Sequence, residues 1–290
     1  MVAPILAFDE INDAKANMDH IYDQPDPRAY FRELKKLGYS IPDVAKPIFQ
    51  KLISSLQRQQ TNAVHVLDLG CSYGVNAALL KYDLTMAELY DHWGVRSLVG
   101  ATHDDVVAHD QRFFENLDYH ADISVTGLDP AEAAISFAED SGLLDEGLAL
   151  NLEAAALPED AKETLSGVDL VMSTGCVGYL TEKSFERLLP AVTQGRPPWI
   201  GNFVLRMFPF EAIEETLDDW GYVTEKLEGR TFVQRHFASP DEQEQVLEQL
   251  RDQSIDPTGK ESEGDLLAEF FLSRPIKDAA VVPVDHLLQA

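Results

Sequence analysis

The sequence is poor in cysteine and in positive charge. Its two cysteines, Cys71 and Cys176, lack the paired spacing of a zinc site and the density of a disulfide-rich secreted domain, so we expect both to be reduced and structural, with no bound metal. Lysine and arginine number 23 against 50 aspartates and glutamates, which gives a formal net charge of -27. Charge of that sign repels a phosphate backbone and an anionic lipid surface, which disfavours nucleic acid and membranes as partners.

Long apolar segments are also missing. No uninterrupted apolar run approaches the ~20 residues that span a bilayer. The N-terminus carries acidic residues from Asp9 onward and does not show the basic and apolar regions of a signal peptide. We therefore expect a soluble, cytoplasmic protein. Hydrophobic residues still make up 45% of the 290-residue chain, which is enough for one sizeable core and predicts one main domain with additions.

Strand and helix patterns alternate through the middle of the chain. Five apolar runs predict strands, and helical periodicity follows most of them, which implies a parallel sheet covered by helices on both faces. Two further strands, separated by a helix, lie nearer the C-terminus. The seven predicted strands are residues 65–69, 123–129, 148–152, 168–173, 199–205, 231–237 and 266–272. The expected fold is α/β, a doubly wound, mostly parallel seven-stranded sheet with an antiparallel C-terminal edge.

Other segments flank or interrupt this sheet. Residues 1–60 are expected to form a helical N-terminal cap, because apolar positions recur at helical spacing in the second half of that range. The main domain would span 61–275, with a helical insertion at about 82–121, and 276–290 would be a C-terminal tail. Aromatic residues of the cap can either close a lid over a pocket or dock an amphipathic helix on the sheet; these are Tyr22, Tyr30, Phe31 and Tyr39.

A glycine turn follows the first predicted strand. Its pattern, Asp68-x-Gly70-x-Ser72-x-Gly74, lies at the carboxyl end of a strand, where parallel sheets bind ligands and glycine lets the backbone approach them closely. Asp129 ends the next strand, and its carboxylate can accept hydrogen bonds from both hydroxyls of a ribose. A dinucleotide is the weaker interpretation, because the turn lacks the G-x-G-x-x-G spacing and the gap to Asp129 far exceeds the ~20 residues of that fingerprint.

Taken in order, these motifs resemble those of class I S-adenosylmethionine-dependent methyltransferases. The resemblance covers about Leu67 to Leu205, including the stretch from Glu153 to Pro158 and the strand that ends in Ser173. It implies a Rossmann-like methyltransferase fold with S-adenosylmethionine as the cofactor. The cofactor-binding residues that it implies are Asp68, Gly70, Ser72 and Gly74 beside the methionine and ribose, Asp129 on the ribose, Glu153 on the adenine amino group, and Ser173, Thr174 and Gly175 as the floor of the site.

Three residues are candidates for a catalytic role. A sulfonium cofactor needs orientation and acceptor groups rather than a metal. Tyr73 and Tyr179, at two strand ends, can face the sulfonium with a ring or a hydroxyl oxygen, although either can simply pack. His236 is the third candidate, in a strand that places alternate side chains on opposite faces. Other residues that can touch a substrate are Arg206, Gln234 and Arg235.

Three functions are compatible with these motifs. The leading one is transfer of the methyl group from S-adenosylmethionine to a small molecule. The alternative is attack of the cofactor's own amine on its γ-carbon, which gives azetidine-2-carboxylate and methylthioadenosine. The chain also resembles azetidine-forming proteins, and no acceptor-activating His/Asp or Cys arrangement is evident near its motifs. A sensor that binds S-adenosylmethionine without turnover is the third. The sequence indicates neither the acceptor nor the oligomeric state.

Overall fold

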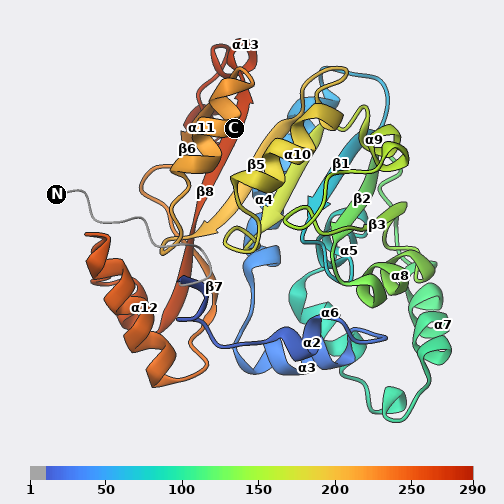
Figure 1. Ribbon diagram of the computed structural model, residues 1–290. Helices are drawn as coiled ribbons and strands as arrows, with labels where there is room; N and C mark the ends of the chain where they lie inside the picture. Colours follow the sequence, from blue (N-terminus) through green and yellow to red (C-terminus); the bar gives the residue numbers. More distant parts are fainter. Residues whose placement is uncertain (1–10, 290) are drawn as a thin grey trace.

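The computed structural model describes residues 11–289, so the first ten residues of the expected cap lie outside the described part. Its centre is one eight-stranded sheet in the order β3-β2-β1-β4-β5-β8-β6, with β7 pairing to β8 beside that path (Figure 1). The strands are β1 (Val64–Leu69), β2 (Ile123–Asp129), β3 (Glu146–Ala149), β4 (Leu170–Thr174), β5 (Trp199–Leu205), β6 (Tyr222–Lys226), β7 (Phe232–His236) and β8 (Asp265–Pro275). Strands β1 to β5 pair in parallel, and β8 pairs antiparallel to its neighbours. The predicted α/β class is confirmed, with eight strands in place of seven.

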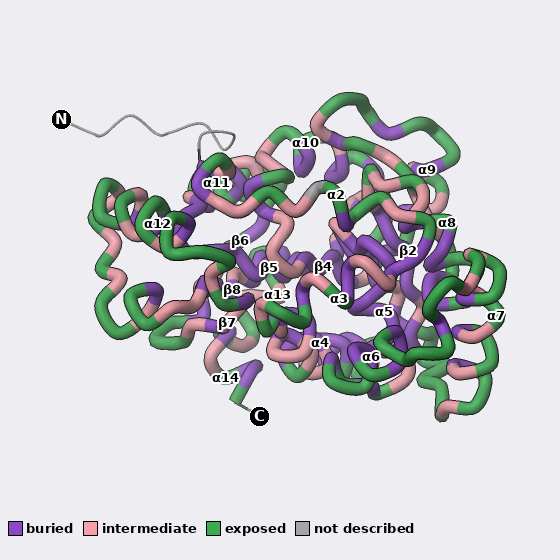
Figure 2. Tube along the Cα trace, turned by 90° about the horizontal axis from the view of Figure 1, so that it is seen from below, coloured by how far each residue is buried: buried purple, intermediate pink, exposed green. Residues whose placement is uncertain are grey.

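Helices cover both faces of the sheet, and the alternation of strand side chains explains why. In β1, Val64 and Val66 belong to one buried cluster, whereas Leu67 and Leu69 belong to the other. Figure 2 shows the strands buried beneath helices whose outer sides are exposed. The first cluster includes residues of α4 (Ile41–Gln57), α5 (Val75–Lys81) and α8 (Glu132–Asp140), and the second includes residues of α9 (Glu159–Leu165), α10 (Glu182–Val192) and α11 (Glu211–Asp219).

The N-terminal helices α2 (Asp19–Tyr22) and α3 (Arg28–Lys36) lie beyond the carboxyl ends of the parallel strands (Figure 1). Tyr30 and Phe31 are buried there and make edge or stacked ring contacts, Tyr30 with Tyr73 at 5.7 Å between centroids and Phe31 with Trp93 at 4.2 Å. These two aromatic residues therefore dock α3 on the body of the protein.

The segment between α5 and β2 is helical and contains α6 (Met86–Trp93), the short 3-10 helix η1 (Arg96–Leu98) and α7 (His103–Phe114). Both α-helices begin at a capping box. Thr85 and Glu88 satisfy the first amides of α6, and Thr102 and Asp105 do the same for α7. Within residues 11–289, no helix is long and apolar enough to cross a membrane.

The C-terminal strands form the predicted antiparallel edge of the sheet. Strand β8 lies between β5 and β6 in this edge, and β6 was not predicted because its residues are largely polar, with only Tyr222 buried. Helix α12 (Pro240–Asp252) and η2 (Glu261–Glu263) connect β7 to β8. The expected tail contains α13 (Ile276–Ala279) and α14 (Val284–Gln289), and Leu288 of α14 is buried and accepts the Lys51 ammonium at its carbonyl oxygen.

Candidate functional site

The motif residues converge at one edge of the sheet. Leu69 of β1 is level with Leu128 of β2 and with Ser173 of β4, and Ser173 is level with Asn202 of β5. The chain segments that follow these four strands therefore leave the sheet side by side, at its carboxyl edge.

The turn after β1 takes the left-handed conformation at three places. Gly70 and Gly74 have φ angles of 69° and 74°, and Ser72 adopts φ 49° although it has a Cβ. A Cβ on Gly70 would lie 2.7 Å from the Cβ of Cys176, so this position has no space for a side chain. The Ser72 hydroxyl oxygen is buried and has no hydrogen-bond partner among the described residues. The turn thus holds an unpaired hydroxyl at the centre of the predicted cofactor site.

Asp129 ties the end of β2 to this turn. Its two carboxylate oxygens accept the backbone N–H groups of Ser72 and Ala131, both at 2.9 Å. Burial raises the pKa of Asp129, and these two N–H groups oppose that rise. Because each carboxylate oxygen has two acceptor sites, both oxygens keep capacity for a further donor such as a ribose hydroxyl.

Asp68, in β1 just before the turn, is a fully buried acid. Its oxygens accept the Asn76 amide at 3.0 and 3.2 Å, and the same amide nitrogen lies 3.1 Å from the Thr174 hydroxyl. Burial raises the pKa of Asp68 to about 8, with the hydrogen bond from Asn76 acting against it and the charge of Asp129 adding to it. Asn76 links Asp68 to Thr174, a role that sequence reasoning missed, although this residue is the one polar residue in the apolar start of α5.

The loop after β4 lies against the glycine turn. Ser173 is fully buried and donates its hydroxyl to Asn202 at 2.7 Å, and Cys176 donates its thiol to the carbonyl of Leu69 at 3.2 Å. Gly175 has φ 78°, and a Cβ there would lie 2.9 Å from the Gln234 side chain. Burial raises the pKa of Cys176 to about 12, so this thiol stays protonated, and both cysteines are free as expected.

Glu153 has its carboxylate occupied by protein donors. It accepts the backbone N–H of Thr181 at 2.9 Å as well as the hydroxyls of Thr181 and Ser184. These bonds lower the pKa of Glu153 against the effect of partial burial, and they organise the start of α10. Binding of adenine by Glu153 stays a prediction.

The two candidate tyrosines lie in different environments. Tyr73 is fully buried, and its hydroxyl accepts the backbone N–H of Gln24 at 2.8 Å and lies 3.0 Å from the Gln24 carbonyl. Tyr73 therefore fastens the segment between α2 and α3. Tyr179 is 56% exposed, and the ammonium of Lys15 lies 4.3 Å from its ring centroid. Of the two, Tyr179 is the more exposed.

Three of the other candidate residues, His236 and Arg235 on β7 and Arg206 after β5, are paired with acidic side chains. His236 lies at the surface, where its Nδ1 is 2.5 Å from Asp265 and its ring contacts Gly38. Arg235 is buried in an ion pair with Glu242, at 2.6 Å. Arg206, after β5, is likewise paired with Glu261 and Glu269. Gln234, the remaining candidate on β7, contacts the β4 loop at Gly175, and its side-chain oxygen is buried without a partner among the described residues.

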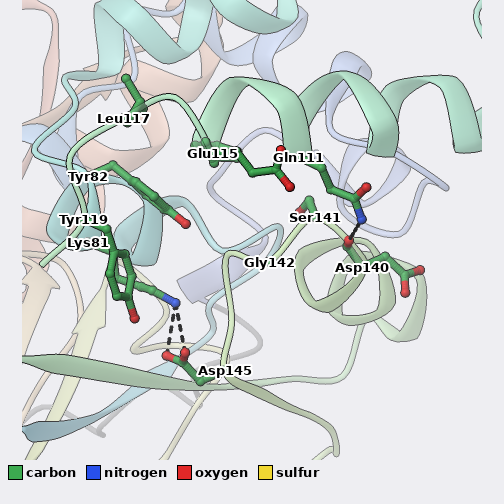
Figure 3. A pocket seen from close by; sticks show the side chains of 11 residues that line it. Lys81, Tyr82, Gln111, Glu115, Leu117, Tyr119, Asp140, Ser141, Gly142 and Asp145 are labelled. Atoms are coloured by element: carbon green, nitrogen blue, oxygen red, sulfur yellow. Dashed lines mark hydrogen bonds and ion pairs between the residues drawn. The ribbon is translucent and has the colours of Figure 1, made fainter. Parts of the chain in front are cut away.

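A separate hollow of about 580 Å³ opens near the opposite edge of the sheet (Figure 3). Lys81, at the end of α5, is paired there with Asp145, which directly precedes β3. Tyr82 and Tyr119 complete its aromatic side. None of the predicted site residues lines this hollow, so it is distinct from the candidate site.

Comparison with known proteins found similarity at the level of structure. No protein-family model matches the sequence, and no curated protein sequence matches it. Several similar solved structures are S-adenosylmethionine (SAM)-dependent methyltransferases. The plantazolicin methyltransferase BpumL in complex with SAH is 13% identical, with a TM-score of 0.45 over 92% of this chain and 97% of that one. A TehB-like methyltransferase from Corynebacterium glutamicum is 15% identical, with a TM-score of 0.37 over 76% and 86%. The magnesium protoporphyrin IX methyltransferase from Synechocystis PCC 6803, with bound SAM, is 11% identical, with a TM-score of 0.39 over 95% and 100%.

Proposed function

We propose that this chain is an S-adenosylmethionine-dependent methyltransferase that acts on a small molecule. The observation that carries the proposal is the pair of carboxylates at the carboxyl edge of the sheet. Asp129 keeps acceptor capacity beside the glycine turn, and Asp68 lies buried at the start of that turn. The Asp129 carboxylate can accept hydrogen bonds from the hydroxyls of a ribose, and the Asp68 carboxylate can pair with the ammonium of an amino acid.

The donor set of the turn fits this cofactor. Burial raises the pKa of Asp68, and no lysine or arginine of the described residues is paired with it; the ammonium of a bound methionine group would supply a cation. The unpaired Ser72 hydroxyl and the left-handed turn offer a further polar group close to the ribose. This cofactor has no phosphate group for the turn to bind, which agrees with a glycine spacing that departs from the dinucleotide-binding motif.

The protein's own contribution is binding and orientation. When bound, the cofactor supplies an electrophilic methyl group on a sulfonium. Asp68 and Asp129 would hold its two polar ends, Ser173 and Thr174 would support it from β4, and the segment that Tyr73 fastens through Gln24 would limit the entry of water. Tyr179 would present its exposed ring on the side of the acceptor.

A second candidate is cyclisation of the cofactor. It is favoured by the positions of Tyr73 and His236, since these two of the three catalytic candidates are hydrogen-bonded to other parts of the protein. In this reaction the cofactor's amine nitrogen bonds to its γ-carbon, the bond from that carbon to sulfur breaks, methylthioadenosine leaves, and the ammonium proton passes to solvent.

The experiment that separates the candidates uses the purified protein and S-adenosylmethionine alone, followed by liquid chromatography and mass spectrometry against a no-enzyme control. Methyl transfer predicts unchanged cofactor until an acceptor pool is added, and then S-adenosylhomocysteine with a methylated product. Methylthioadenosine above the control supports cyclisation. Intact cofactor with every acceptor pool, together with measurable binding, would identify a sensor.

A further inference from the structure

Lys15 places a positive charge over the ends of β4 and β5. Its ammonium nitrogen lies 4.3 Å from the ring centroid of Tyr179, in the loop after β4, and 4.8 Å from that of Phe208, which follows β5. Asp129, the predicted ribose ligand, ends β2 on the other side of the glycine turn. Lys15 therefore lies on the side of the glycine turn away from the predicted ribose ligand.

The backbone on each side of Lys15 is fixed to the body of the protein. The Asn12 amide donates to the carbonyl of Gly178 at 2.6 Å, and the backbone N–H of Ala16 donates to Glu242 at 2.8 Å. The Phe208 ring packs so closely on Gly178 that a Cβ there would lie 2.6 Å from it. The ammonium is thus held near both rings by contacts that neighbouring residues make with the β4 loop and with α12.

This charge has no ionic partner in the described part of the protein. Among the side chains that the structure describes, no Asp or Glu oxygen lies within 4.0 Å of the Lys15 ammonium. Glu242, a carboxylate that favours the charged form of Lys15, is bonded to Arg235 and to the Ala16 amide. Burial, followed by the charge of Arg235, lowers the pKa of Lys15 to about 7, against the effects of Glu242 and Cys176.

Buried cations are normally paired, because leaving water without a counter-ion is costly. In a chain this rich in aspartate and glutamate, a partly buried lysine that lies against aromatic rings and has no carboxylate partner within residues 11–289 is unusual.

We propose that Lys15 binds a carboxylate of the ligand that enters at the ends of β4 and β5, and hence that the methyl acceptor is a small carboxylic acid. This inference rests on the proposed function. The methionine group of the cofactor is a second source of a carboxylate, but the place of Lys15 over β4 and β5 favours the acceptor.

Calorimetric titrations test the inference with three proteins, the wild type, Lys15→Met and Lys15→Arg. The Met variant removes the charge and keeps an apolar stem, and the Arg variant keeps the charge. Benzoate is the carboxylate probe and benzyl alcohol its uncharged match, each titrated with and without S-adenosylhomocysteine. S-adenosylhomocysteine and methylthioadenosine are titrated separately, because only the first carries a carboxylate.

We expect benzoate to bind the wild type and Lys15→Arg at least tenfold more tightly than Lys15→Met, with benzyl alcohol unaffected. A tenfold loss of S-adenosylhomocysteine affinity in Lys15→Met, with methylthioadenosine unchanged, supports the carboxylate role and assigns the carboxylate to the cofactor. Equal binding of benzoate and of S-adenosylhomocysteine by the wild type and Lys15→Met overturns the inference. A wild type that binds benzoate through Lys15 but binds neither nucleoside keeps the carboxylate site at Lys15, but it rejects the proposed function and with it the assignment of that carboxylate to a methyl acceptor.

Discussion

The carboxylate of Asp129 accepts the backbone N–H of Ser72 across 2.9 Å, which joins the end of β2 to the turn after β1. Replacing Asp129 with Asn removes the charge and turns one acceptor into a donor that faces a backbone N–H. We expect S-adenosylhomocysteine to bind about 10- to 100-fold more weakly, in line with the ~1.5–3 kcal/mol of a hydrogen bond to a charged group. Calorimetry measures this, with exposed Asp118→Asn as the matched control. Unchanged affinity in Asp129→Asn would contradict the ribose role.

The raised pKa of Asp68 predicts that a proton is released when the cofactor binds. With its pKa at about 8, this acid is largely protonated at pH 7 in the free protein. An ammonium bound beside it would lower that pKa, so the proton leaves as the ligand binds. Titration of S-adenosylhomocysteine at pH 7 in two buffers of different ionisation enthalpy should show proton release in the wild type and less in Asp68→Asn. Equal proton release in both proteins would show that Asp68 does not meet the ammonium.

The same acid predicts how the stability of the ligand-free protein depends on pH. The pKa of Asp68 is raised from 3.8 to about 8, so between these values the folded state holds a proton that the unfolded state has lost. Stability from this group is therefore present at low pH and is lost as the pH rises towards 8. We expect urea unfolding at pH 5, 6.5 and 8 to show a steeper fall in unfolding free energy for the wild type than for Asp68→Asn. Parallel curves would contradict the buried, protonated state of Asp68.

Two glycines allow backbone strain to be separated from crowding. Gly70 and Gly142 both have positive φ, but a Cβ on Gly142 would meet nothing within 4 Å, whereas one on Gly70 would meet Cys176 at 2.7 Å. We expect Gly142→Ala to cost about 1–2 kcal/mol of unfolding free energy from conformation alone. Gly70→Ala should cost about 1–3 kcal/mol more, because the added methyl overpacks the loop after β4. Denaturant unfolding measures the unfolding free energy of both variants. Equal losses would mean that the loop after β4 shifts to accommodate the added methyl group without cost.

Tyr73→Phe tests how the N-terminal segment is fastened. The change removes the hydroxyl that accepts the Gln24 amide and leaves the buried ring in place. We expect hydrogen exchange at Gln24 to accelerate about five- to tenfold, which corresponds to the ~1 kcal/mol of one hydrogen bond. Tyr119→Phe, at an exposed tyrosine, is the control and should leave this exchange unchanged. If Tyr73→Phe also leaves it unchanged, the segment is held by other contacts.

The parallel half of the sheet could be predicted because its strands are largely apolar runs. Trp199–Leu205 is buried at every position, as is typical of a strand covered by helices on both faces. The antiparallel half of the sheet was harder to predict, since β6 buries only Tyr222. The polar residues around Tyr222 are typical of loops as well as of edge strands. The strand order also depends on long-range pairing of β8 with β5, which local patterns do not encode.

The candidate site was predictable where a residue type is tied to backbone geometry. Gly70 and Gly74 follow the end of β1, Asp129 ends β2, and the structure brings the two strand ends together. Lys15 could not have been found, because its importance comes from contacts with Tyr179 and Phe208, which lie far later in the sequence.

Strand β8 pairs with β5, β6 and β7, and it follows all three of them in the sequence. During synthesis, β1 to β5 leave the ribosome well before β8, so the edge of β5 stays uncovered until β8 has been made. A message truncated within the β7 to β8 connection would yield a protein whose first five strands can pair but whose sheet ends in an open, apolar strand. Nascent chains of this protein therefore depend on β8 to close the sheet, and termination before β8 exposes a surface that chaperones and proteases recognise.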